Sequence, residues 1–135
     1  MSALAPPPAP GDAPDATLRI GNLEIRPSEF QVLADGRRVH LTVREFETFL
    51  ALAMHLDRVL PRPLIYDLVW GGRMAYRDRS VDVFIRKVRR KLEAAAPDWT
   101  YIHTHFGIGY RFSPERIAGP RGSMGGLSPA QSPGG

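Results

Sequence analysis

The fold of this chain is decided by residues 78–93, whose sequence is DRSVDVFIRKVRRKLE. On a helical wheel, the apolar residues of this stretch fall within about 60° of one another. They are Val81, Ile85, Val88 and Leu92. The opposite side carries Arg79, Val83, Arg86, Lys87 and Arg90. The spacing predicts a helix over residues 79–95, with one face buried in a core and the other dense in arginine.

The positive charge of the chain is concentrated in the same region. Residues 73–91 hold eight basic and two acidic side chains, whereas the rest of the chain holds ten basic and twelve acidic ones. A helix of this kind is suited to a DNA major groove, where some side chains read base edges while flanking arginines hold phosphates. The alternative is an ordinary surface helix, since a cluster of charged residues usually forms a solvent-exposed face. The turn and hairpin signals that follow favour the DNA-binding interpretation.

Composition narrows the class of protein. The chain has 135 residues, enough for one domain, and contains no cysteine. The lack of cysteine excludes a disulfide scaffold, a thiol nucleophile and a cysteine zinc site. No apolar stretch is long enough to cross a bilayer and no leader opens the sequence, so we expect a cytoplasmic protein without a membrane partner. Sixteen of the eighteen basic residues are arginine, which suits forked contacts to phosphates and base edges.

The two ends differ in composition from the middle. Residues 1–16 contain five prolines, and residues 118–135 contain six glycines and three prolines. Segments of this composition bury too little apolar surface to offset their chain entropy. The sequence therefore predicts disordered tails over residues 1–16 and 117–135, and one folded domain over residues 17–116.

The hydrophobic period within that domain changes at Thr42. Between residues 18 and 41, short alternating apolar runs are separated by turn signals, which predicts an antiparallel meander of three or four strands. Thr42 and Glu45 have the spacing of a capping box, in which each side chain accepts a hydrogen bond from the other's backbone amide. Apolar residues then follow at helical spacing, namely Phe46, Phe49, Leu50 and Ala53.

Two further elements are predicted around the arginine-rich helix. A shorter helix is indicated by Leu64, Ile65, Leu68 and Val69. Pro61 and Pro63 lie at its start, where a missing amide hydrogen costs little, and Gly71-Gly72 ends it. Residues 101–106 and 110–112 flank Gly107-Ile108-Gly109, which is a hairpin signature. The predicted order is a β-meander, three helices and a β-hairpin.

These motifs together resemble the winged-helix effector domains of OmpR/PhoB-type response regulators. The resemblance covers residues 18–113 and rests on Val69-Trp70-Gly71, on residues 78–93, on residues 107–112 (GIGYRF), and on Leu41-Thr42 with Glu45-Phe46. It implies an α+β winged helix-turn-helix, in which a four-stranded N-terminal sheet precedes three helices and a C-terminal hairpin wing. It also implies sequence-specific binding of double-stranded DNA, with the third helix in the major groove and the wing beside the adjacent minor groove.

The resemblance also implies which residues meet which partner. The implied DNA-binding residues are Trp70, Arg79, Ser80, Asp82, Val83, Phe84, Arg86, Lys87, Arg89, Arg90, Thr104 and Tyr110. Trp70 and Thr104 match positions that touch backbone phosphate in relatives. The loop between the second and third helices resembles a segment that contacts RNA polymerase in activators. That loop comprises Gly72, Arg73, Met74, Ala75, Tyr76 and Arg77. A tandem dimer on repeated half-sites is expected by the same resemblance.

The sequence departs from the family pattern at three places. His105-Phe106 stands where relatives often carry an arginine that probes the minor groove; a phenylalanine there packs inward or wedges against sugars. Phe84 replaces a residue that is often polar, and either touches a thymine methyl or extends the core, which its wheel position favours. Pro61 and Pro63 replace a polar helix entry, which leaves the fold intact but weakens the case for a phosphate contact from that helix start.

Other function classes find little support in the residues. Glu45 and Glu47 diverge on a helix, so they do not make a catalytic carboxylate pair. His103 and His105 share one face of a strand, the minimum for a metal pair, but no third ligand is near. No phosphate-binding glycine loop and no nucleophile–base pair is readable. We therefore expect no enzyme, no cofactor, no metal and no small-molecule ligand.

Two alternatives stay open at this point. The missing wing arginine is compatible with a protein-interaction module that contacts RNA polymerase or another regulator without reading DNA, whereas the retained arginine face argues against it. No segment of residues 1–16 resembles a phosphorylatable receiver domain. The chain is then either a stand-alone member of the family or an excised effector domain.

Overall fold

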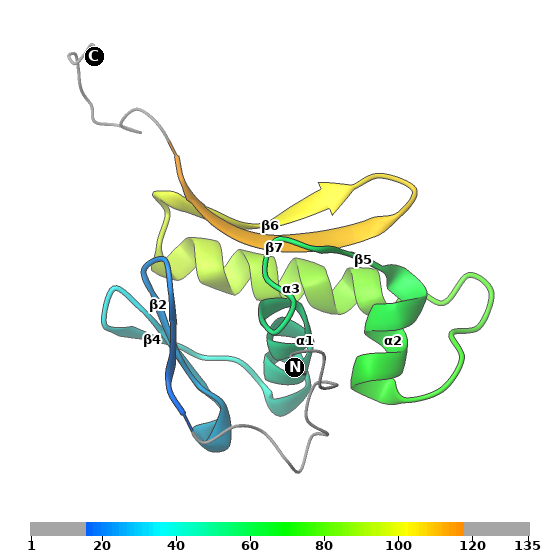
Figure 1. Ribbon diagram of the computed structural model, residues 1–135, viewed down its shortest axis with the longest axis horizontal. Coiled ribbons are helices and arrows are strands. Elements are labelled where there is room, and N and C mark those ends of the chain that lie inside the picture. The colour runs from blue at the N-terminus through cyan, green and yellow to red at the C-terminus, as the bar shows by residue number, and fades with distance from the viewer. Residues whose placement is uncertain (1–15, 118–135) are drawn as a thin grey trace, which may run out of the picture.

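The computed structural model describes residues 16–117, and within that range it has seven strands, three α-helices and one short 3-10 helix (Figure 1). The observed order is the predicted one, with two additions. They are a 3-10 helix, η2 (Pro27–Glu29), and a strand, β5 (Val59–Pro61). The tails predicted over residues 1–16 and 117–135 lie outside the described residues, apart from one residue each. Among the described helices none is long and apolar enough to span a membrane.

The fold begins with a four-stranded antiparallel meander. Its strands, in spatial order, are β1 (Leu18–Ile20), β2 (Leu23–Arg26), β3 (Gln31–Ala34) and β4 (Arg37–Val39). Cross-strand pairs such as Ile25 with Val32, and Val32 with Val39, place the buried side chains on one face. The predicted meander of three or four strands is therefore confirmed with four.

The three helices begin and end where the sequence signals them. They are α1 (Val43–Ala53), α2 (Arg62–Trp70) and α3 (Ser80–Ala95). At the start of α1 the capping box is present: the Glu45 amide donates to Thr42 Oγ1 at 3.2 Å, and the Thr42 amide donates to Glu45 Oε1 at 2.9 Å. At the end of α2, Gly71 has a φ of 81°, a left-handed conformation that glycine adopts without strain.

The C-terminal sheet has three strands and not the two that were predicted. The hairpin strands β6 (Trp99–His105) and β7 (Gly109–Arg116) are joined by β5 on the free edge of β7. β5 has only three residues and pairs with a strand about fifty positions later, so no local alternation signals it. Gly109 lies opposite Pro61, and a Cβ atom at Gly109 would stand 1.9 Å from the Leu60 carbonyl oxygen. The close approach of β5 therefore requires glycine at this position.

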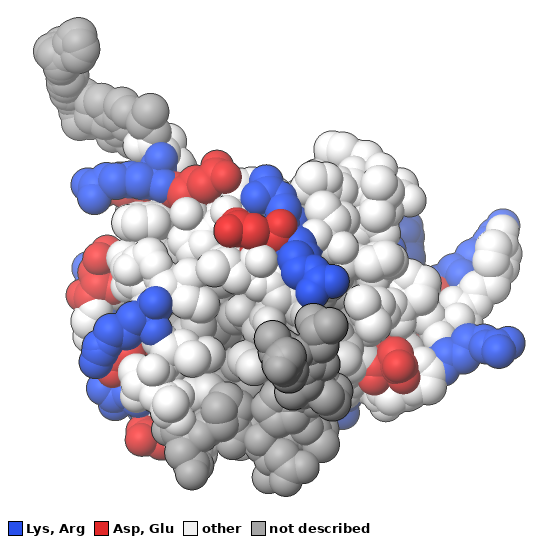
Figure 2. All heavy atoms as spheres, viewed as in Figure 1, with Lys and Arg blue, Asp and Glu red and all other residues white. Residues whose placement is uncertain are grey.

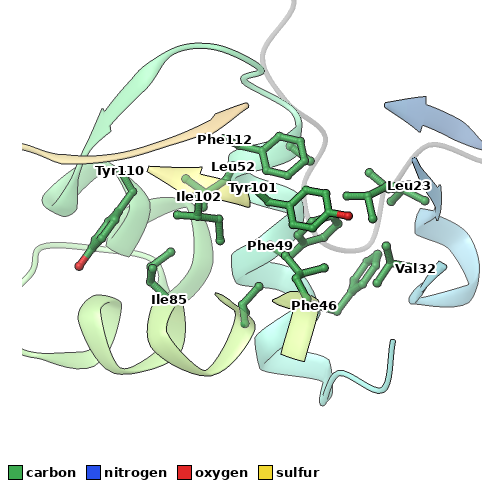
Figure 3. Close-up of a cluster of buried hydrophobic side chains, with 14 of the residues drawn as sticks. Leu23, Val32, Phe46, Phe49, Leu52, Ile85, Tyr101, Ile102, Tyr110 and Phe112 are labelled. Carbon is green, nitrogen blue, oxygen red and sulfur yellow. The ribbon is translucent and has the colours of Figure 1, made fainter. Parts of the chain in front are cut away.

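A single hydrophobic core joins the two sheets to the helices (Figure 3). Phe49 of α1 meets Phe112 of β7 edge to face, with ring centroids 5.5 Å apart. The Tyr101 hydroxyl donates to Asn22 Oδ1 at 2.6 Å, which ties β6 to the β1–β2 turn. Burial raises the pKa of Tyr101 to about 12. In Figure 1, α3 lies directly against the β6–β7 hairpin, so its buried stripe faces the core while its other sides border the wing, α2 and solvent.

Candidate nucleic-acid interface

The exposed side of α3 carries most of the predicted DNA-binding cations. Exposed residues on this side span a sector of about 100° on the helical wheel. We call them the α3 outer face, and they are Arg79, Val83, Arg86, Lys87 and Arg90. Val81 and Ile85, in contrast, are almost completely buried. The amphipathic division predicted from residues 78–93 is thus present in the structure.

The N-terminus of α3 is fixed by an acidic side chain. The Asp78 carboxylate accepts a hydrogen bond from the Ser80 backbone amide at 2.8 Å, and this bond lowers the pKa of Asp78. Ser80, the first residue of α3, is half-buried. Arg79, the residue before the helix, keeps its side chain exposed. The first turn of α3 therefore has a defined orientation before any partner is present.

The loop from Gly72 to Arg77 projects beside α2 and α3. Met74 is half-buried and packs against the core, whereas the other five residues of the loop are exposed. Tyr76 is 89% exposed, and the Arg77 guanidinium lies 5.3 Å from its ring centroid. Figure 2 shows the blue side chains of this segment at the right edge of the molecule. The loop thus presents an aromatic ring and two arginines to solvent.

One flank of α3 is bonded to the wing through Asp82. The Arg62 Nε donates to Asp82 Oδ1 at 2.7 Å, and the Tyr110 hydroxyl donates to the same oxygen in a short hydrogen bond. Burial raises the pKa of Asp82, but these two hydrogen bonds outweigh burial and the pKa lies below its usual value. Burial and the bond to Asp82 raise the pKa of Tyr110, and the bond to Asp82 raises that of Arg62.

The same flank of α3 meets the wing a second time at Arg89. Its Nη2 donates to the Ile102 carbonyl at 3.1 Å and to Thr104 Oγ1 at 2.9 Å. The Arg89 and Arg62 guanidinium groups both lie near the Tyr110 ring, at 5.9 and 5.0 Å from its centroid. We call this set the wing network, and its members are Arg62, Asp82, Arg89, Thr104 and Tyr110. Four of the twelve predicted DNA-binding residues are thus engaged inside the protein.

The opposite flank of α3 lies against α2 through aromatic rings. Phe84 is half-buried and meets Trp70 edge to face at 5.4 Å, and Trp70 stacks on Tyr66 at 5.2 Å. The Arg44 guanidinium lies 5.3 Å from the Trp70 ring, and Lys87 Nζ lies 4.9 Å from the Phe84 ring. Phe84 therefore packs against the helix-turn-helix, in line with the core interpretation that its wheel position favoured.

The tip of the wing is apolar and exposed. Phe106 is 88% exposed and Ile108 is 55% exposed, on either side of Gly107, whose φ is 78°. Of the two expectations for Phe106, inward packing is therefore wrong, because its side chain projects into solvent. In Figure 2 the protrusion at the upper right, where Figure 1 places the hairpin tip, is white.

The two wing histidines make hydrogen bonds within the hairpin. His103 Nε2 lies 2.9 Å from the Ser113 carbonyl oxygen and 3.8 Å from the Glu115 carboxylate, and Arg111 Nε donates to His105 Nε2 at 3.2 Å. Over residues 16–117, no three His, Cys, Asp or Glu residues stand close enough to hold a metal ion.

Arg62 is the site residue that the sequence reasoning missed. It is the first residue of α2, and nothing in its local sequence signals a partner twenty residues later on α3. The wheel did hold a signal for Asp82 and Arg89. They fall within about 20° of each other and roughly 80–100° from the centre of the α3 outer face. This angle sets Asp82 and Arg89 apart from Arg86 and Arg90 and indicates that they point toward another element packed beside α3.

The fold and this arrangement define a winged helix-turn-helix domain with an N-terminal antiparallel sheet. Residues 36–112, more than half of the chain, match the family model described as transcriptional regulatory protein, C terminal. The chain belongs to this family of OmpR/PhoB-type regulatory domains, which confirms the resemblance read from the sequence.

Individual relatives agree with this assignment. The chain is 34% identical over 106 residues to the alkaline phosphatase synthesis transcriptional regulatory protein PhoP of Bacillus subtilis, covering 78% of this chain and 44% of the relative. It is 33% identical over 104 residues to the phosphate regulon regulator PhoB of Pseudomonas aeruginosa, covering 77% and 44%. The chain therefore spans less than half the length of these curated relatives.

Solved structures give the same result. The DNA-binding domain of Klebsiella pneumoniae RstA, in complex with the RstA box, aligns with a TM-score of 0.65 at 33% identity, over 72% of this chain and 96% of that one. The DNA-binding domain of CpxR from E. coli aligns with a TM-score of 0.65 at 31% identity, over 73% and 96%. The winged-helix fold expected from the sequence is confirmed by these neighbours.

Proposed function

We propose that this domain is a transcriptional regulator that binds double-stranded DNA in a sequence-specific manner, with α3 in the major groove and the β6–β7 wing beside it. The observation that carries the proposal is the α3 outer face, where four cations surround Val83. Arginine forks suit guanine edges and phosphates, and an apolar side chain between them suits a thymine methyl. The related RstA domain, whose structure is a complex with its DNA box, supports the same mode.

The predicted residues take different parts in this proposal. Arg79, Arg86, Lys87 and Arg90 approach the duplex directly, together with Val83. Trp70, Ser80 and Phe84 line the helix-turn-helix at its edge, within reach of the phosphate backbone. The activity is binding, without a reaction, a cofactor, a metal or a small-molecule ligand, and it takes place in the cytoplasm, where a bacterial chromosome lies.

Two further partners belong to the proposal. A single module of this size buries only about 600–1,000 Å² of its own surface on DNA, so two copies on tandem half-sites are needed for tight binding. The loop from Gly72 to Arg77 contacts RNA polymerase, because it presents Tyr76 and two arginines outside the α3 outer face. The alternative of an interaction module without DNA reading is less favoured, because clustered guanidinium groups repel one another without an anionic partner.

The experiment is selection of duplexes from genomic fragments by the wild type, followed by sequencing. A double variant, Arg86→Ala/Lys87→Ala, is run beside it, with Arg37→Ala/Arg38→Ala as the matched control. The control removes the same charge from exposed positions on β4. We expect a recurring motif, as a direct repeat about one helical turn apart, that is lost in the first variant and kept in the control.

Other outcomes would change the assignment. Retention of fragments without a motif means that the domain contacts only the phosphate backbone. If the folded wild type retains no fragment, DNA binding is wrong and the interaction module takes its place. The salt dependence provides a second check, because each phosphate neutralised by a cation steepens the slope of log affinity against log salt by about 0.9.

A further inference from the structure

The five residues of the wing network connect three elements that are distant in sequence. Arg62 begins α2, Asp82 and Arg89 lie on α3, and Thr104 and Tyr110 face each other on β6 and β7. Asp82 and Arg89 are seven residues apart on one flank of α3, or about 10 Å along the helix axis. The wing is therefore attached to α3 at two separated points, which restrains rotation as well as translation.

The polar groups of Tyr110 and Arg89 are already engaged within the protein. Tyr110 is only 6% exposed, and its hydroxyl is taken by Asp82. Both identified hydrogen bonds of Arg89 end on β6, and its Nε is buried without a hydrogen-bond partner among residues 16–117. Before the Tyr110 hydroxyl or the Arg89 Nη2 can bond to DNA, these intramolecular hydrogen bonds must be broken or shared. Arg86 and Arg90, in contrast, are exposed on the next side of the same helix.

The attachment extends to the hairpin tip. The Arg62 backbone amide donates to the Ile108 carbonyl at 3.3 Å, while its side chain bonds to Asp82. Because β5 also pairs with β7 up to Gly109, the start of α2 is bound to the wing by its backbone and by its side chain. The position of Phe106 and Ile108 relative to the α3 outer face is thus set within the free domain.

We propose that Arg62, Asp82, Arg89, Thr104 and Tyr110 are positioning residues, which hold the wing at a fixed place relative to α3 so that both meet DNA without rearrangement. This inference rests on the proposed DNA-binding function. Four residues predicted to contact DNA would then support binding indirectly, by holding the wing in place. A surface that is already arranged for its partner loses less conformational entropy on binding. Breaking the wing network therefore weakens DNA binding without altering which bases are read.

The test compares Thr104→Val, which removes the hydroxyl that accepts from Arg89, with Thr104→Ser, which keeps it. Tyr110→Phe removes the hydroxyl that donates to Asp82 and keeps the ring near which both guanidinium groups lie. Amide hydrogen exchange is measured on the free domain, and affinity on a duplex selected by the wild type. From the typical net strength of one hydrogen bond, we expect Thr104→Val and Tyr110→Phe to speed exchange in β6 and β7 by about threefold to tenfold and to weaken affinity similarly.

The controls separate positioning from general destabilisation and from direct contact. Exchange in α1 stays at the wild-type rate, and Thr104→Ser behaves as the wild type in both assays. Asp82→Asn is expected to weaken binding while the selected motif stays the same. Unchanged wing exchange in both Thr104→Val and Tyr110→Phe overturns the inference, and so does a changed base preference in Asp82→Asn. If the wild type binds no duplex, the proposed function fails, while hydrogen exchange still decides whether the network holds the wing.

Discussion

The buried carboxylate of Glu45 makes a quantitative test of how α3 is held in the domain. It accepts hydrogen bonds from the Thr42 amide at 2.9 Å and from Lys91 Nζ of α3 at 2.7 Å. Its side chain is 5% exposed, whereas that of Lys91 is 40% exposed. One carboxylate thus caps α1 and anchors α3 to it.

The stability that Glu45 contributes can be estimated from these contacts. Glu45→Ala leaves the Thr42 amide without its partner, which costs about 1 kcal/mol. The bond to Lys91 adds about 1–2 kcal/mol, less than for a fully buried charge pair, because the half-exposed ammonium regains water. We expect Glu45→Ala to lower the free energy of unfolding by about 2–3 kcal/mol, which corresponds to a Tm lower by roughly 10–20 °C for a domain of this size. Glu45→Gln keeps the cap acceptor and is expected to cost about 1 kcal/mol.

The assay is urea unfolding followed by the fluorescence of the two tryptophans, with the m value checked for constancy. Glu47→Ala is the matched control, because Glu47 lies on the same helix and, within the described part of the chain, forms only an i,i+3 pair with Arg44 at 3.6 Å. Its expected cost is about 0.2–0.5 kcal/mol. A loss for Glu45→Ala no larger than that for Glu47→Ala would refute the reasoning.

The same carboxylate predicts a pH dependence. Burial raises the pKa of Glu45, but the hydrogen bonds from Lys91 and Thr42 outweigh burial and lower the pKa below 4.5. Because the folded-state pKa is lowered, the stabilisation is complete above the unfolded-state pKa and is lost as the pH falls through the folded-state pKa. The stability difference between the wild type and Glu45→Gln is therefore full at neutral pH and shrinks below about pH 4.5. If the stability difference between the wild type and Glu45→Gln grew as the pH falls, the predicted direction of the pH dependence would be wrong.

Two further predictions concern the wing. Gly109→Ala places a Cβ atom 1.9 Å from the Leu60 carbonyl oxygen, so we expect a loss of about 1–3 kcal/mol or more in urea unfolding. Gly107→Ala is the comparison, because its Cβ atom meets no atom of the described residues within 4 Å and costs only the strain of a positive φ, about 1 kcal/mol. Phe106→Arg is expected to tighten binding to sites flanked by A·T pairs, since a guanidinium favours a narrow minor groove. Unchanged affinity with an intact fold would mean that the wing does not reach the groove.

Most of the fold was predictable because its signals are local. The capping box at Thr42, the glycines after Trp70 and the apolar stripe of α3 each depend on residues within a few turns of one another. β5 was missed for the opposite reason, since three residues have no period and their partner strand lies far along the chain. Pro61 even concealed it, because the same proline also suits the entry of α2.

The candidate site was predictable as a region but not residue by residue. Charge density located α3, and the wheel separated its buried stripe from its outer face. The amino-acid type alone did not tell Arg89 from Arg90, because both are arginines on the same turn. Arg90 is exposed, whereas Arg89 is half-buried and donates to Ile102 and Thr104. The position of Arg89 on the helical wheel indicates that it lies toward a neighbouring element, but only the folded structure shows that this element is β6.

The sequence by itself determined the order of elements, the amphipathic character of α3 and its excess of arginine, because hydrophobic period, caps and charge are properties of consecutive residues. Only the tertiary structure decided which of those side chains stay exposed and which bond to another element. The third strand of the C-terminal sheet, the bonding of Arg62 to Asp82 and the outward direction of Phe106 all depend on segments brought together by folding. Such contacts form because the elements bury a common core, and their partners are fixed by that packing and not by distance along the chain.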